Sequence, residues 1–453
     1  MAQIYLISLL VLVFLKYFRL IVNCIAYWCY KPVPLSDEPR FTPNDVTVVI
    51  PSLDGDNDEL RETVRSVLTN DPHKVILVTI DANLEKAESA FLKMSEKIEI
   101  HSIPKANKRR QLCKALPLVT TEITILADDD VSWPPNLLPW MLAPFEDEKM
   151  GGVGTNQRLR REKNPNIWNF LGAAYLIRRN WDCTACEFMD GGLPCLSGRT
   201  VAYRTDIIND PEFIYSFTHE TWRSCQLNAD DDNFLTRWMV NHGWKTWIQH
   251  HRDCEVQTTL ENNSKYLLQC LRWARSNWRS NLKSLFVEGT VWRRHPWSTF
   301  AVFQTTLTSW SLPYDASMLW LFWQVTSTMQ HDTQRIVRIL FLFWVVLICR
   351  VVKYMGHFAR YPEDLKYIML IPLFGYFHSC SIKLYAMLTM HVTTWGSREG
   401  ADVDDAWRLI HLPGYSPSGS DRRKPNVVNE IDEHYLEELE EQRLLLPKYD
   451  DDA

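Results

Sequence analysis

The segment Ile125–Trp133 reads ILADDDVSW and joins an apolar run to three consecutive carboxylates. The apolar run Ile123–Leu126 has the length and the β-branched content of a buried strand. Adjacent anions repel one another and lose hydration when they are partly buried. The triplet Asp128–Asp130 is therefore either a solvated turn or a place where a cation binds at the end of a strand.

Strands and helices alternate around this segment. The predicted strands are Val46–Ile50, Val75–Ile80 and Glu122–Leu126, and the predicted helices are Asp58–Thr69, Leu84–Ser95 and Lys108–Leu116. Short β-rich runs separated by helices predict an α/β fold with a wound, mainly parallel sheet. Ligands of such sheets bind at the carboxyl ends of the strands. Asp81 and the triplet Asp128–Asp130 both fall at such ends, which favours a functional site.

The composition excludes some classes of function. The 453 residues carry 49 basic and 55 acidic side chains, a formal charge of −6, so no nucleic-acid partner is expected. The eleven cysteines are odd in number and lack a disulfide framework spacing, which favours reduced thiols. Cys183 and Cys186 form one CxxC motif without a second pair, so no zinc site is expected.

Apolar residues gather in four long segments, which are Ile4–Tyr30, Trp297–Val325, Ile336–Val352 and Tyr367–Val392. A helix of roughly 20 apolar residues crosses a bilayer, so these are candidate membrane segments. The alternative for the first is a cleaved signal peptide, although it has no basic start and no obvious small-residue cleavage site. Lys16 and Arg19 fall in the middle of the first segment, where a charge is costly inside a bilayer. The helix is therefore bent into the interface, or the two side chains snorkel to the interface, or they have a partner inside the helix bundle.

Two further segments, Ile167–Arg179 and Tyr266–Phe286, combine helical periodicity with Trp and basic residues. Such helices often lie along a membrane surface; the alternative is an ordinary helix of a folded domain. From Tyr415 onward the chain is polar, with one acidic helical stretch at Asn429–Leu445, which predicts a loosely ordered tail.

A second acidic triplet, Asp230–Asp232, stands directly before an apolar helical face. These acids either cap the helix N-terminus or include a carboxylate that takes a proton from a hydroxyl nucleophile. The stretch QCLRW at Gln269–Trp273 then places an amide, a guanidinium and an indole on one helix. Arginine suits phosphate and tryptophan suits the face of a sugar, although an ordinary interface helix has the same composition.

The order of Asp81, ADDD, CLSGRTVAYR, DDDNFLT and QCLRW resembles the membrane-bound family-two glycosyltransferases, particularly hyaluronan synthases and their fungal relatives; chitin and cellulose synthases share the core. The resemblance covers roughly Val46 to Gly400. It implies a cytosolic GT-A domain with a mixed, mainly parallel sheet, nucleotide-sugar donors (UDP-sugars foremost), a divalent cation and inversion at the transferred sugar. The polymer would leave through the protein's own transmembrane channel, so the implied partners are donor, growing polysaccharide and lipid bilayer, and the implied location is the plasma membrane.

On the donor side, the resemblance implies nucleotide contacts by Asp54, Asp81, Lys108, Arg109 and Asp128. Asp130, together with Asp128, would ligate Mg²⁺ or Mn²⁺. Leu53-Asp54 stands where relatives usually carry an aromatic residue followed by Asn, so the nucleoside contact departs from the family pattern.

On the acceptor side, Asp232 matches the general base, and Asp231 is the second choice. Ser197 and Gly198 match the segment near the acceptor sugar, and Gln269, Arg272 and Trp273 match the QxxRW motif that holds the diphosphate and the acceptor terminus. The stretch WGSR (Trp395, Gly396, Ser397 and Arg398) resembles the gating loop of hyaluronan synthases. Asn233 stands where those enzymes carry Arg, so the resemblance leaves the polymer unidentified.

These inferences divide the chain into an N-terminal membrane segment (1–31), a catalytic domain with interface helices (40–290), a C-terminal membrane region (296–392), a gating loop (393–412) and an acidic tail (413–453). A cytosolic domain and a cytosolic loop require an even number of crossings between them. Tyr367–Val392, interrupted by Pro372, is therefore the candidate non-spanning segment; alternatively, Trp297–Val325 breaks at SLPYD. Two other functions stay open: transfer of one sugar to a lipid, and a scaffold without turnover.

Overall fold

The computed structural model describes residues 2–163, 165–223, 225–307 and 310–393. The predicted gating loop at Trp395–Arg398 and the predicted tail from Tyr415 lie outside the described residues.

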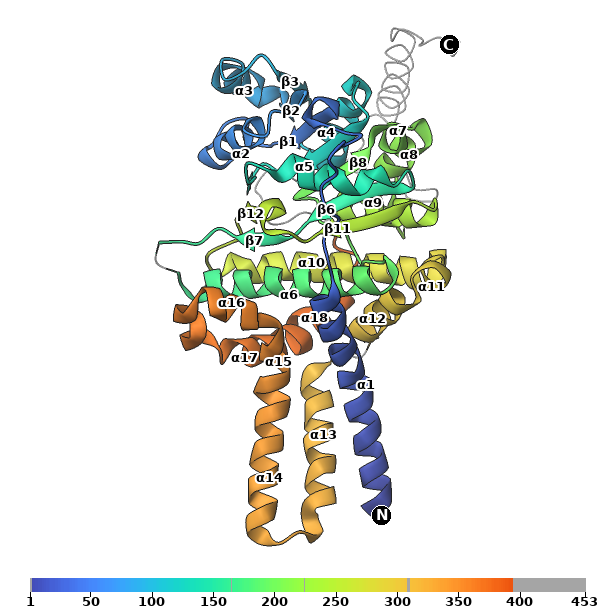
Figure 1. The fold of residues 1–453 in the computed structure, drawn as a ribbon, viewed down its shortest axis with the longest axis vertical. Helices are drawn as coiled ribbons and strands as arrows, with labels where there is room; N and C mark the ends of the chain where they lie inside the picture. The colour runs from blue at the N-terminus through green and yellow to red at the C-terminus, as the bar shows by residue number, and fades with distance from the viewer. Residues whose placement is uncertain (1, 164, 224, 308–309, 394–453) are drawn as a thin grey trace, which may run out of the picture.

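A seven-stranded sheet forms the upper half of the molecule (Figure 1). Its order is β11 (Lys245–Gln249), β6 (Met150–Thr155), β8 (Thr200–Arg204), β4 (Ile123–Ala127), β1 (Val46–Pro51), β2 (Lys74–Ile80) and β3 (Ile98–Ile103). β8 runs antiparallel to both β4 and β6, and the other neighbouring pairs are parallel. The prediction of a mixed, mainly parallel sheet is confirmed.

Helices cover both faces of the sheet, which explains why the central strands β1 and β4 are buried along their whole length. The helices α2 (Asp58–Leu68), α3 (Leu84–Phe91) and α5 (Leu137–Leu142) pack in one core. The helices α4 (Lys108–Ala115), α7 (Thr205–Ile208), α8 (Pro211–Thr218) and α9 (Asp231–Asn241) pack in the other. The three helices predicted here are present, with α3 ending at Phe91 rather than at Ser95.

Two long helices, α6 (Ile167–Asp190) and α10 (Lys265–Leu282), lie across the molecule beneath this domain (Figure 1). They share one apolar core with the C-terminal helices. α6 continues past the predicted end at Arg179 and stops where Gly191 adopts the left-handed conformation, with φ 70°. α10 continues into a π-helical turn, Lys283–Glu288. Small strands lie nearby: β5 (Val131–Ser132), β12 (Val256–Thr258) and β7 (Gln157–Leu159) form one sheet, and β9 (Thr221–Trp222) pairs with β10 (Cys225–Gln226).

The helix α1 (Ala2–Cys29) runs away from the domain beside α13 (Ser311–Val325) and α14 (His331–Phe343) (Figure 1). Within the described residues, Gln3–Cys29 is the one helix that is long and apolar enough to cross a membrane. Its 27 residues have a mean hydropathy of 2.1 in their most apolar window.

The three predicted C-terminal membrane segments are helical over most of their described length, and the first is divided between two helices. Trp297–Val325 is shared between α12, which is Pro296–Leu307, and α13, which begins with the SLPYD stretch at Ser311. Ile336–Val352 runs through α14, a π-helical segment (Trp344–Ile348) and α15 (Cys349–Val351), ahead of α16 (Met355–Arg360). Tyr367–Val392 holds α17 (Leu370–Phe377), a π-helical segment (His378–Ile382) and α18 (Lys383–Leu388). α11 (Val291–Arg294) precedes α12.

The two charged residues of α1 have partners inside the protein. Lys16 forms an ion pair with Asp315 of α13. Arg19 lies 3.8 Å from Asp182 of α6 and donates to the Ala301 carbonyl and the Thr305 hydroxyl at 3.2 and 2.6 Å. Of the three explanations for these charges, the structure therefore selects a partner within the bundle.

Candidate active site

The two acidic triplets meet at one cavity of about 1030 Å³. The first triplet follows β4, the second opens α9, and the cavity continues between α6 and α10 toward the helix bundle. Its lining includes Asp128, Asp129, Asp130, Asp230, Asp231, Asp232, Gln269, Arg272 and Trp273. Side chains that are about 100 residues apart in the sequence therefore share one site.

Lys108 joins the two triplets. It is the first residue of α4, whose N-terminus is capped by the Asn107 side chain. Its Nζ donates to Asp128 Oδ1 and to Asp231 Oδ2, each at 2.8 Å. Burial alone would lower the pKa of Lys108, but the two carboxylates outweigh it and raise the pKa above its ordinary value. Lys108 is therefore charged and fastens the end of β4 to the start of α9.

Asp230 has a structural role. It adopts the left-handed conformation, with φ 65°, which is unusual for a residue other than glycine. The Arg279 guanidinium donates to both of its carboxylate oxygens at 2.7 and 3.0 Å, and both side chains are 3% exposed. The same guanidinium donates to the carbonyls of Met390 and Val392. Since the Asp230 side chain makes no capping bond to α9, its bond to Arg279 rather than helix capping accounts for its position.

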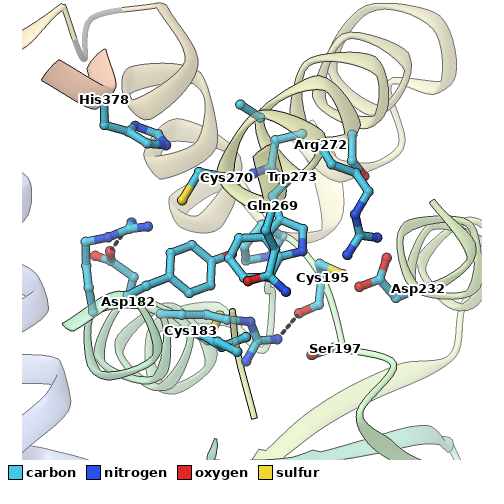
Figure 2. Close-up of a pocket in the computed structure, with 18 of the residues that line it drawn as sticks. Asp182, Cys183, Cys195, Ser197, Asp232, Gln269, Cys270, Arg272, Trp273 and His378 are labelled. Atoms are coloured by element: carbon cyan, nitrogen blue, oxygen red, sulfur yellow. Dashed lines mark hydrogen bonds and ion pairs between the residues drawn. The ribbon is translucent and has the colours of Figure 1, made fainter. Parts of the chain in front are cut away.

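The other two acids of this triplet differ in their pKa. Burial would raise the pKa of Asp231, but the charge of Lys108 outweighs it and lowers the pKa. Burial and the neighbouring Asp231 carboxylate raise the pKa of Asp232. The Asp232 carboxylate points toward the Arg272 side chain on the same side of the cavity (Figure 2). A carboxylate of raised pKa at a cavity wall has the properties of a general base.

The QCLRW residues, on α10, form the wall next to Asp232. Trp273 stacks on Tyr175 of α6, with ring centroids 4.5 Å apart and planes 16° apart, and the Arg199 guanidinium lies over it at 5.7 Å. Gln269 accepts a hydrogen bond from the Glu261 backbone at 3.4 Å. Burial lowers the pKa of Arg272. The helix therefore places one ring of a stacked aromatic pair and a guanidinium at the wall of one cavity.

Ser197 and Gly198 lie beside the acids. A Cβ atom on Gly198 would stand 3.4 Å from Lys108 Nζ and 3.6 Å from Asp231 Oδ2, so the backbone passes close to both. The Ser197 hydroxyl accepts from Arg199 at 3.2 Å. The predicted acceptor segment is thus next to the predicted base.

Three predicted residues do not line this cavity. Asp54 and Asp81 are exposed at the carboxyl ends of β1 and β2, where Asn83 ties their loops together by donating to the Leu53 carbonyl at 2.8 Å. Arg109 is 1% exposed and donates to the Phe217 and Ala229 carbonyls and to Glu220, each within 2.8 Å. Successive residues of a helix point about 100° apart, so Lys108 faces the cavity and Arg109 faces the core.

The Arg109 contacts reveal an ion cluster that the sequence did not indicate. Glu220 accepts from Arg109, Arg237 and Lys283. Burial would raise the pKa of Glu220, but the three cations outweigh it and lower the pKa to about 2. The cluster supports the segment that leads into Asp230, since Arg109 also holds the Ala229 carbonyl.

The acids at the cavity include the residues predicted to bind a cation. Within the described residues, no group of three or more His, Cys, Asp or Glu side chains converges to hold an ion by itself. Mg²⁺ is commonly bound by one or two carboxylates together with the phosphates of a ligand. Asp128 and Asp130 both line the cavity and supply that number of oxygen donors, so they fit a hard cation that binds together with a phosphate group.

Comparison with known proteins decides the family. The family model described as glycosyltransferase like family 2 matches residues 43–276. The chain belongs to glycosyltransferase family 2. A type 2 glycosyltransferase of Zymoseptoria tritici is 48% identical to it, over 96% of this chain and 92% of that protein. A hyaluronan synthase of Streptococcus pyogenes is 23% identical, over 79% of this chain and 84% of that protein.

The fold of this glycosyltransferase matches a solved mannosyltransferase of Pyrobaculum calidifontis, in complex with GDP-Man and Mn2+, with a TM-score of 0.51 and 14% identity. The match covers 83% of this chain and 99% of that structure. The likeness supports a GT-A-like glycosyltransferase fold. Family membership and this fold make the protein a transferase, which removes the scaffold alternative.

Proposed function

We propose that this glycosyltransferase uses a nucleotide-sugar to extend a glycan acceptor with inversion at the transferred sugar. One observation carries the proposal: Lys108 contacts Asp128 and Asp231 at 2.8 Å in one cavity, so the donor-side acids and the acceptor-side acids form a single site. The GDP-Man and Mn2+ bound by the structural relative support a nucleotide-sugar donor and a divalent cation.

On the donor side, Asp130 and Asp128 would hold Mg²⁺ or Mn²⁺, which supplies charge neutralisation for the departing diphosphate when it is bound. Lys108 and Arg272 add positive charge to the same cavity. Asp54 and Asp81 lie at the strand ends where nucleosides bind in open α/β sheets, and we assign them to the rim of the nucleoside site.

On the acceptor side, the sugar stacks on Trp273, with Ser197, Gly198 and Gln269 around it. Asp232 accepts the proton of the attacking hydroxyl, whose oxygen forms the new bond to the anomeric carbon as the diphosphate oxygen leaves from the opposite face. Lys108 holds Asp231 as a carboxylate, and the charge of Asp231 keeps Asp232 basic. Asp231 is the second choice for the base.

We further propose that the chain is an integral membrane protein with a cytosolic catalytic domain, that the product is a polysaccharide, and that the polymer crosses the membrane along the same cavity. The cavity supports this, because its lining continues from the acids to Lys16 and Tyr314 in the helix bundle. The loop Trp395–Arg398 would close over the donor.

A second function, transfer of one sugar to a lipid, is favoured by a separate observation: one helix within the described residues has the length and hydropathy of a membrane span. Product size separates the two functions. Purified protein is incubated with Mn²⁺ and a panel of labelled nucleotide-sugars, and the products are resolved on a gel. A ladder of long products supports the polymerase, and a single lipid-linked sugar supports the alternative. If none of the donors is turned over, both functions are rejected.

A further inference from the structure

The end of the cavity nearest the helix bundle is lined by cations. They are Lys16, Arg19, Arg178, Arg350, Lys353 and Lys383, from five different helical segments. The carboxylates that pair with them are Asp182 and Asp315. The proposed transfer chemistry uses none of these residues.

Three of the cations converge on Asp182. Lys353 lies 2.9 Å from its carboxylate, Arg178 lies 3.5 Å away and Arg19 lies 3.8 Å away. One carboxylate balances one of these charges, and the remaining like charges repel one another. The group around Asp182 therefore has positive charge available for a second anion.

A second group follows deeper in the bundle. Asp315, with a side chain that is 2% exposed, pairs with Lys16 and with Arg350 at 2.7 Å, and accepts from the Tyr376 hydroxyl at 2.9 Å. Here too two cations share one carboxylate. Excess charge at membrane depth is costly and marks the path of a charged substrate.

The aromatic surface lies between the Asp182 group and the proposed base. Figure 2 shows Asp232 and Arg272 on one side of the cavity, Asp182 on the other, and Trp273 and Gln269 between them. A glycan with its terminal sugar on Trp273 and its hydroxyl at Asp232 would place its preceding sugars toward Asp182.

We infer that the cations around Asp182 form an anion site for the carboxylate of an acidic sugar in the acceptor glycan. This inference rests on the proposed function. A phosphate on a lipid carrier has charge of the same sign, but it would meet one cation group only. The two successive cation groups, at Asp182 and at Asp315, match a glycan whose acidic sugars recur along its chain.

The test uses full-length protein in lipid nanodiscs. Glycan binding is the main measurement, and Mn²⁺-dependent hydrolysis of the donor is measured separately. Binding of a tetragalacturonate is compared with binding of the same oligosaccharide after its carboxyl groups are reduced to alcohols. We expect the acidic form to bind at least 10-fold more tightly, and Lys353→Gln to remove most of that preference. Arg178 and Arg19 still pair with Asp182 in this variant, so the fold is retained, and Lys353→Arg restores the preference.

The matched control is Lys366→Gln, which removes the same charge from an exposed position outside the cavity and leaves the preference unchanged. Equal binding of the acidic and reduced forms overturns the anion site. So does competition by inorganic phosphate that is stronger than that of the tetragalacturonate, which assigns the cations to a lipid phosphate. Donor hydrolysis that persists in either case shows that the proposed transferase function stands without the anion site; its absence rejects that function instead.

Discussion

The two acidic triplets have the same sequence, but the fold uses them differently. Asp128–Asp130 ends a strand and faces the cavity, with Lys108 as a neighbour. Asp230–Asp232 starts a helix, and its members differ in surroundings: Asp230 pairs with Arg279, Asp231 pairs with Lys108, and Asp232 faces Arg272. The role of each carboxylate therefore follows from the cation beside it.

The largest effect should come from the acid that we assign as base. Asp232→Asn keeps the shape of the side chain but removes its basicity, so we expect transfer to fall roughly 1000-fold while nucleotide binding changes little. Steady-state transfer rates and equilibrium binding of the nucleotide measure the two quantities. Asp231→Asn is the control, and a larger loss in that variant would move the base to Asp231.

The second prediction concerns the structural acid of the same triplet. Arg279→Gln leaves the Asp230 carboxylate buried with its charge unbalanced, which should destabilise the protein by about 3 kcal/mol. Asp230→Asn should cost less, because Asn tolerates the left-handed conformation and carries no charge. Thermal unfolding of the purified variants measures both. Equal melting temperatures for Arg279→Gln and the parent would show that the pair is not structural.

The fold was predictable where its pattern is local. The strands Val46–Pro51 and Ile123–Ala127 follow from short apolar runs, and their helices follow from 3.6-residue periodicity. The meeting of the two triplets was implied only by the family resemblance, since no local pattern brings Asp128 to Asp231. The C-terminal membrane segments stay a prediction, and hydropathy did not register the division of Trp297–Val325 between α12 and α13.

The site was predictable in part. Lys108 and Arg109 are adjacent, and sequence alone did not tell which of them would face the cavity. The cations at Asp182 come from positions 19, 178 and 353. Such a group has no sequence signature, because three distant segments must pack before it exists.

The third prediction tests the first triplet. Asp130→Ala removes an oxygen ligand, so the Mn²⁺ concentration that gives half-maximal donor binding should rise at least 10-fold. A titration of donor binding with Mn²⁺ measures it. Asp129→Ala serves as the neighbouring control, and we expect a smaller shift there. Unchanged metal dependence in Asp130→Ala would reject its role as a ligand.

The smallest expected effect is a shift in pH dependence. Asp232 must be ionised to act as a base, and its raised pKa means that transfer is lost on acidification at a pH above the usual range for Asp, near 3.9. Burial comes first among the causes, followed by the Asp231 carboxylate, with Asp230 also raising the pKa and Lys108 lowering it. Asp231→Asn removes one raising charge but also one partner of Lys108, whose positive charge then acts more strongly on Asp232. Both changes favour the ionised form, so the acid limb of the pH–rate profile should move to lower pH by less than about one unit, which is worth 1.4 kcal/mol. A shift toward higher pH would show that the charges of Asp231 and Lys108 do not set the pKa of Asp232 in this way.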